Sequence, residues 1–256
     1  MIFTLAAKEL KALFISPLAW LVLVLFQFII GFSFLKRLDG YMQMQPQLAL
    51  LPHPPGVTAL VVAPTYGTAA VILLFAVPLL AMRMIAEERR NRTMTLLTSS
   101  PLTMTTIVLG KFAGLLGFLL IVIALVTLMP VMLTAGGTID FGLLTTLVIG
   151  LVLTAASFAA VSLFVSSLTT HPVGAAVAAF GVLLAMVLLG EAATEGLRER
   201  GWQAAASMVQ VLAPLDNFDS FTRGLIDSYS TVCMILLTLV CLALAIRRLD
   251  ALRLKG

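Results

Sequence analysis

The sequence predicts an all-α integral membrane protein with six transmembrane helices, and three observations predict it. Hydrophobic residues make up 61% of the 256 residues and charged residues only 11%, whereas a soluble domain carries about 25% charged residues. The charges fall in clusters between long uncharged stretches. Those stretches are continuously apolar rather than alternating, which favours helices over a β-barrel because a helix satisfies its backbone amides within the segment.

The predicted spans form a single transmembrane domain over residues 1–256. Each is close to the roughly 20 apolar residues that cross a bilayer, and they cover about residues 18–35, 59–82, 112–133, 141–165, 173–190 and 229–246. Pro172 begins the fifth of these helices. Residues 40–58, on the outer side, are rich in proline, which argues against regular structure there.

The distribution of basic residues predicts that both termini are cytoplasmic. In that orientation eleven lysines and arginines lie inside and five lie outside, as the positive-inside rule requires. This orientation accounts for the formal charge of +4 without a nucleic-acid partner. The eleven inside residues are Lys8, Lys11, Arg83, Arg89, Arg90, Arg92, Lys111, Arg247, Arg248, Arg253 and Lys255.

Two further segments are predicted to be helices that do not cross the bilayer. Residues 2–15 carry apolar side chains at helical spacing, which predicts an amphipathic helix in the cytoplasmic interface. The alternative is an extension of the first span, but Lys8, Glu9 and Lys11 would make that costly. Residues 202–212 are mostly apolar but too few to span, so they predict a re-entrant or interfacial helix on the outer side.

The chain lacks the residues of several energy-coupling and catalytic mechanisms. The predicted span interiors contain no Asp, Glu, Lys or Arg, the groups with which ion-coupled carriers bind their coupling ion. No GxxxxGK[ST] phosphate loop is present, nor a GxSxG or HExxH motif. His53 and His171 are expected on opposite faces and so predict no shared metal site. We therefore expect no catalytic residue, cofactor or metal in this chain, and energy for transport would come from outside the membrane.

The segment between spans two and three is the most distinctive part of the sequence. Charged residues open it, apolar residues follow, and Pro101 stops a helix just before it. Residues 87–100 therefore predict a short amphipathic helix on the cytoplasmic face, of a shape that docks into a groove of a soluble partner. The alternative is a solvated loop that only anchors the topology.

The same segment carries a family resemblance. Glu87, Thr93, Pro101, Gly110 and Lys111 have the spacing Glu-x5-Thr-x7-Pro-x8-Gly-Lys. This pattern resembles the first cytoplasmic loop of ABC-2 type exporter permeases, and more narrowly the gliding-motility-type branch. Residues 8–18 and 213–227 share the resemblance, so that it frames nearly the whole chain. Two positions depart from the family: Arg92 stands where a Gly is frequent, and Thr95 where a Glu is frequent.

The resemblance implies the transmembrane domain of an ABC-2 (type V) exporter. In that family the loop holds a coupling helix that meets the ATPase, with the N-terminal helix, including Lys8, Glu9 and Lys11, as a second contact. Gly110, Gly114 and Gly117 are expected to allow close helix packing. The residues implied in ATPase coupling are Glu87, Glu88, Arg89, Arg90, Thr93, Leu96, Leu97, Pro101 and Lys111.

The implied partners are a separate ABC ATPase subunit, which would carry ATP and Mg, and a second permease copy, identical or related. An auxiliary extracytoplasmic protein is a further candidate partner. The implied location is the bacterial cytoplasmic (inner) membrane. Two other functions stay open: a non-transporting membrane scaffold, and a secondary transporter, against which the lack of charge inside the spans argues.

Overall fold

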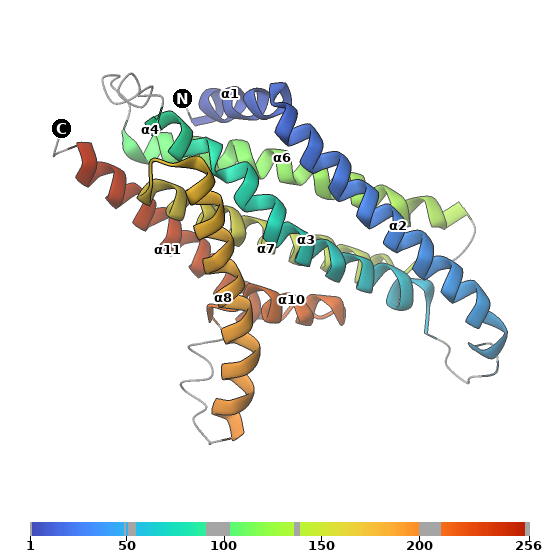
Figure 1. Cartoon of the computed structure of the whole chain (residues 1–256). Coiled ribbons are helices and arrows are strands. Elements are labelled where there is room, and N and C mark those ends of the chain that lie inside the picture. The colour runs from blue at the N-terminus through green and yellow to red at the C-terminus, as the bar shows by residue number, and fades with distance from the viewer. Residues whose placement is uncertain are drawn as a thin grey trace.

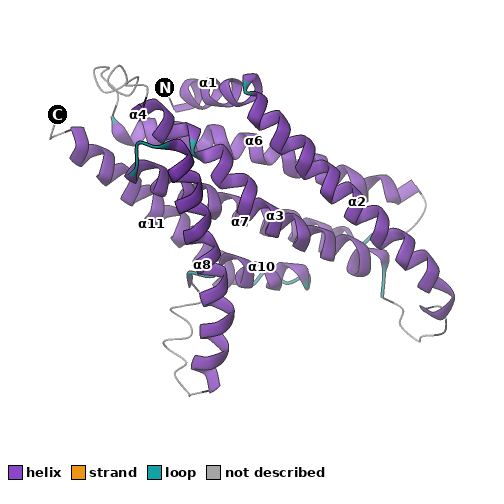
Figure 2. Ribbon diagram, in the orientation of Figure 1, coloured by secondary structure: helices purple, strands orange, loops and turns teal. Residues whose placement is uncertain are grey.

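The computed structural model describes residues 2–48, 50, 55–90, 103–135, 139–199 and 211–253, and of Glu87, Ala135 and residues 191–199 it describes the backbone only. Over these residues the chain is helical and contains no strand (Figure 2). Six of the helices are long and apolar enough to cross a membrane. The predicted fold class, an all-α membrane protein with six transmembrane helices, is confirmed.

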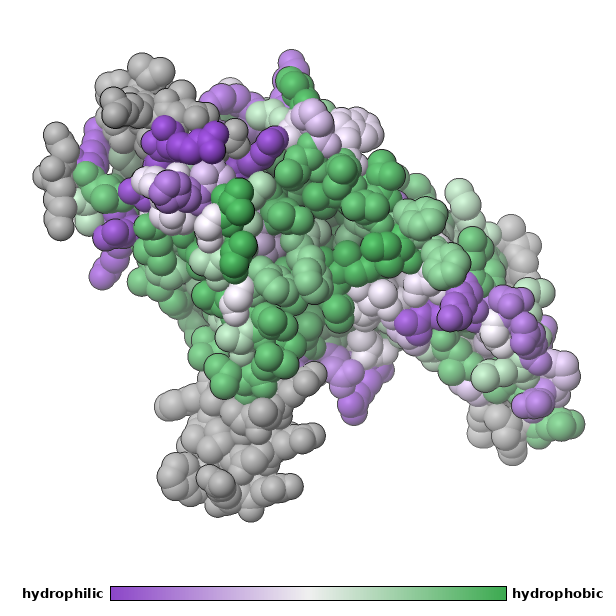
Figure 3. Space-filling view, viewed as in Figure 1, coloured by the Kyte–Doolittle hydropathy of each residue, from purple (hydrophilic) through white to green (hydrophobic). Residues whose placement is uncertain are grey.

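The long helices lie side by side, and both termini lie at the same end of the bundle (Figure 1). We call this end the termini end and the other the far end. Hydrophobic side chains cover the middle of the face shown in Figure 3, and hydrophilic ones gather toward both ends. The elements are α1 (Ile2–Ile15), α2 (Pro17–Leu48), η1 (Thr58–Val62), α3 (Ala63–Ala81), η2 (Arg83–Glu87), α4 (Glu88–Arg90), α6 (Met104–Met132), η3 (Leu133–Ala135), α7 (Phe141–Leu168), α8 (Pro172–Glu199), α10 (Pro214–Thr222) and α11 (Ser228–Arg253).

Several helices extend beyond the apolar runs that predict them. Helix α2 continues through Leu48, so the expectation of irregular structure is wrong for residues 40–48. Apolarity limits the part of a helix that lies in lipid, but polar residues can continue the same helix in water. Pro46 is tolerated because it lies in the last turn of α2, where few backbone hydrogen bonds are lost. Similarly, α8 continues through Glu199 and α6 begins at Met104.

Helices α3 and α7 form the centre of the bundle. Most of their residues are buried, whereas α2 and α8 expose long apolar side chains such as Phe28, Phe32 and Val177. The buried face of α7 is rich in small residues, which allow neighbouring backbones to approach closely. These small residues are Gly150, Ala155, Ser157, Ala159, Ala160 and Ser162.

At the far end, the short helix α10 packs across α7. Pro214 begins it, a favourable residue for a first helical turn. Phe221 is fully buried, and its ring lies where a Cβ on Gly150 would stand, 2.7 Å from its Cγ. Most of the predicted outer helix at 202–212 falls outside the described residues. Helix α10 itself is not predicted from the sequence, because its nine residues are too few to give a clear apolar period.

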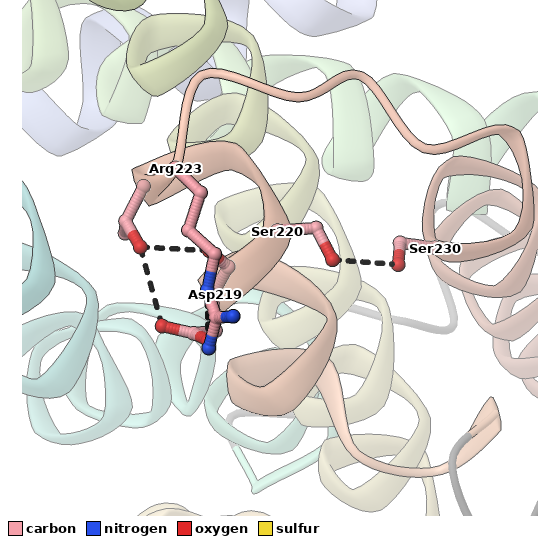
Figure 4. A network of polar contacts seen from close by, with 5 residues as sticks. Asp219, Ser220, Arg223 and Ser230 are labelled. Atoms are coloured by element: carbon pink, nitrogen blue, oxygen red, sulfur yellow. Dashed lines mark hydrogen bonds and ion pairs between the residues drawn. The ribbon is translucent and has the colours of Figure 1, made fainter.

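A polar network closes the turn between α10 and α11 (Figure 4). Arg223 Nη2 lies 2.6 Å from Asp219 Oδ2, and the hydroxyls of Ser220 and Ser230 are 3.4 Å apart. Gly224 adopts a φ of 78°, a backbone conformation that glycine adopts readily. Of these contacts, the one between Ser220 and Ser230 joins α10 to α11.

Candidate functional site

Helix α1 lies on the first turns of α6 at the termini end, and two glycines make this contact possible. A Cβ on Gly114 would stand 2.6 Å from Glu9 Cβ and 3.0 Å from the Ala6 carbonyl oxygen, and one on Gly110 would stand 2.6 Å from Leu5 Cδ2. Only glycine allows this approach of the two backbones. Gly117, also predicted to serve packing, leaves 3.8 Å to its nearest neighbour, an ordinary contact.

A buried ion cluster lies directly beside these glycines. Lys111 Nζ is 3.1 Å from Glu9 Oε1 and 2.7 Å from Glu88 Oε1. The exposed fractions of the three side chains are 0% for Lys111, 7% for Glu9 and 19% for Glu88. The cluster thus joins α6, α1 and α4 around one ammonium group.

The cluster is nearly balanced in charge. Two carboxylates face one buried ammonium, and Lys8 Nζ, on an exposed side chain, lies 3.9 Å from Glu9 Oε1. An unpaired ammonium at the Lys111 position would be costly, since removing a partner from a buried ion pair costs about 3–5 kcal/mol. A carboxylate partner is therefore needed for Lys111 to be buried.

The segment of residues 83–90, which we call the link, also contacts the bundle by hydrogen bonds. Arg83 Nη1 donates to Ser16 Oγ at the corner between α1 and α2. The Ala86 backbone N–H donates to Ser166 Oγ on α7, at 3.1 Å. Arg89 Nη1 donates to the Ser167 carbonyl, at 2.7 Å, and so satisfies a carbonyl at the end of α7 that the helix leaves without an internal partner.

The other side of the loop is fixed where α6 begins. Thr103 caps α6, with its Oγ1 accepting from the Thr106 backbone N–H at 3.2 Å. The predicted coupling residues Thr93, Leu96, Leu97 and Pro101 lie outside the described residues, as does the side chain of Glu87. The described residues on both sides of the loop are thus held against the bundle.

Three of the site residues named from the sequence make contacts within the chain. Glu9 is buried, because it lies in the stripe that Leu5 and Leu13 form against α6. Glu88 and Arg89 make contacts within the chain. Lys8, Lys11 and Arg90 are exposed, as a solvated face requires.

The sequence contains a signal for the ion cluster. Lys111 is the only charged residue between positions 102 and 139, and a lone charge in an apolar helix calls for a partner. Glu9 lies four residues from both Leu5 and Leu13, the spacing of a shared helix face. No such signal marks Ser16, Ser166 or Ser167, since serines of this kind are common in helices.

A family model that matches nearly the whole chain decides its family. A family model described as "ABC-2 family transporter protein" matches residues 3–251. The chain belongs to the ABC-2 transporter family. A comparison with curated proteins finds no match.

Membership of the ABC-2 family sets the class of the protein. It is a multi-pass membrane protein and an ABC transporter permease, the membrane component of transport rather than the catalytic one. The narrower resemblance to the gliding-motility-type branch stays a prediction.

Proposed function

We propose that this ABC-2 protein is the membrane-spanning subunit of an ABC exporter. It couples ATP hydrolysis on a separate ATPase subunit to export, or to work on an extracytoplasmic partner. Residues 87–100 form the coupling helix, and α1 is a second contact with the ATPase. ATP and Mg belong to the ATPase subunit, and a second permease copy completes the unit.

The observation that carries this proposal is the attachment of the link. Membership of the ABC-2 transporter family supports ATP-driven transport, in which energy has to enter the bundle somewhere. Through Arg83, Glu88 and Arg89 the link contacts the corner between α1 and α2, helix α6 and the end of α7. A force applied between residues 90 and 103 would therefore reach several helices at once, whereas a loop without such contacts would absorb it.

The termini end is proposed to face the cytoplasm of a bacterium, with the chain in the inner membrane. Phe3, near the N-terminus, is 89% exposed, and Leu50, on the far side of α2, is 86% exposed. In intact cells a membrane-impermeant maleimide should label Leu50→Cys and not Phe3→Cys, while permeabilised cells should show both labelled. Cys233 and Cys241 are buried and can be replaced by alanine to remove background. Labelling of Phe3→Cys in intact cells would contradict the proposed orientation and place the termini end outside.

The docking role of the coupling helix is tested by charge. The double variant Leu96→Asp/Leu97→Asp places two carboxylates on the proposed docking face, where burial without a partner is costly. The spans are unchanged, so insertion should persist. We expect co-purification of the ATPase to fall about tenfold or more, since a loss of 1.4 kcal/mol already gives that factor.

The matched control places the same charges elsewhere. Leu50→Asp/Leu225→Asp changes two exposed leucines away from the link and should assemble normally. If the Leu96/Leu97 variant binds the ATPase and supports its activity as the unaltered chain does, the segment is a topology anchor. A chain that binds no ATPase in any form would favour the scaffold function instead.

A further inference from the structure

At Lys111 the helices α1, α4 and α6 meet through charge. Its ammonium lies within 3.1 Å of a carboxylate from α1 and within 2.7 Å of one from α4. No contact between Glu9 and Glu88 is needed for this arrangement, because each carboxylate binds the same ammonium. Lys111 is also fully buried, so its role does not involve direct contact with a partner protein.

We infer that Lys111 is a positioning residue that makes α1, the link and the first turns of α6 move as one unit. This inference rests on the proposed coupling function: displacement of the coupling helix would pass through Glu88 to Lys111, and from Lys111 to both α6 and Glu9. Helix α1 is then moved by the permease itself, in addition to any contact of its own with the ATPase.

The geometry favours a specific tie over general packing. Apolar contacts between helices are non-directional, and the close contact of α1 with Gly110 and Gly114 sets the distance between the two helices. Charge-assisted hydrogen bonds of about 2.7–3.1 Å are directional, so the Lys111 pairs set the position of α1 along α6.

The two ion pairs of Lys111, with Glu9 and with Glu88, are the two arms of the cluster, and each can be removed separately. Glu9→Gln removes the carboxylate on α1 and leaves Lys111 paired with Glu88, whereas Glu88→Gln leaves Lys111 paired with Glu9. Each single variant keeps one ammonium and one carboxylate, so folding should persist. Lys111→Met removes both arms and leaves two buried carboxylates, which makes it the harsher variant.

Amide hydrogen exchange of the permease alone, in bilayer discs and without an ATPase, measures how firmly each arm holds its segment. Glu9→Gln should speed exchange in α1 by about a hundredfold, as expected when a buried pair is broken, and leave residues 83–90 unchanged. Glu88→Gln should do the reverse, and Lys111→Met should speed both. Lys36→Met, which removes an exposed lysine from α2, is the control and should change neither segment. If Lys111→Met changes neither segment, or both arms respond equally to either glutamine, Lys111 is not the tie.

The coupling role is read on the complex with the ATPase that co-purifies with the chain. At equal amounts of assembled complex, Glu9→Gln and Glu88→Gln should stimulate its hydrolysis about tenfold less, as 1.4 kcal/mol of lost coupling would give. A purely stabilising role would leave the activity per assembled complex unchanged, and that result would overturn the inference. If the unaltered chain binds no ATPase, the proposed function fails and the coupling role with it, whereas the exchange pattern still decides whether Lys111 ties the segments.

Discussion

Replacing Gly114 by alanine is expected to lift α1 from α6 and to destabilise the protein. The new Cβ would stand 2.6 Å from Glu9 Cβ and 3.0 Å from the Ala6 carbonyl oxygen, and a backbone atom cannot give way as a flexible side chain can. Overpacking of this kind costs about 1–3 kcal/mol. If α1 moves, Lys111 also loses Glu9, which adds a further part of the roughly 3–5 kcal/mol that a broken buried pair costs. These losses exceed the gain of about 1 kcal/mol that alanine brings over glycine in a helix.

Gly117→Ala is the matched control for this prediction. It makes the same change on the same helix, but its Cβ would stand 3.8 Å from the nearest atom, a methyl of Leu10. It should therefore be neutral or slightly stabilising. Trp20, whose Nε1 donates to the Phe14 carbonyl at 2.7 Å, reports on α1 once Trp202 is replaced by phenylalanine. A shift in Trp20 emission and a lower unfolding midpoint in detergent should appear for Gly114→Ala alone. Equal behaviour of the two variants would contradict the close seat of α1.

The second large effect is expected at the far end, where Phe221→Ala should release α10 from α7. Phe221 is fully buried, and its backbone carbonyl accepts from Thr146 Oγ1 at 3.2 Å. Emptying such a site costs about 3–5 kcal/mol when the surroundings cannot collapse. The Gly150 position has no side chain with which to fill the space. The unfolding midpoint in a fixed detergent measures the loss.

A double-variant cycle distinguishes this contact from a general loss of stability. Gly150→Ala alone puts a Cβ 2.7 Å from Phe221 Cβ and should also destabilise. Combined with Phe221→Ala, the 2.7 Å contact with the ring Cγ is removed, although the one with Cβ stays, so the two losses should add to less than their sum. Additive losses would show that α10 does not rest on Gly150.

The fold could be predicted from the sequence because the length of an apolar run decides whether it crosses the bilayer, and the placement of charges decides its orientation. Six long uncharged runs are enough to predict six crossing helices, and the bias of basic residues to one side predicts their orientation. The helix ends could not be predicted from the same signal. Hydropathy marks where a helix leaves lipid, and it does not mark where the backbone stops being helical, as residues 36–48 of α2 show.

The arrangement of the ion cluster could not be predicted from the sequence. The family resemblance and local patterns indicate Lys111, Glu9, Glu88, Gly110 and Gly114 as coupling, interfacial or packing residues, and not as one cluster. Their meeting depends on α1 folding back onto α6, a contact between residues about a hundred positions apart. No helical period or local motif reports such a contact, since local patterns describe the faces of one helix and not which faces meet.

The sequence distance between Glu9 and Lys111 also orders events during synthesis. The two residues are 102 positions apart, so at about 5–20 residues per second Lys111 is made roughly 5–20 s after Glu9. During that interval the surface on which α1 will rest does not yet exist. Helix α1 is thus translated before α6, yet it can dock only once α6 has been inserted. A nascent chain arrested before residue 104 would keep α1 undocked and Glu9 without its lysine.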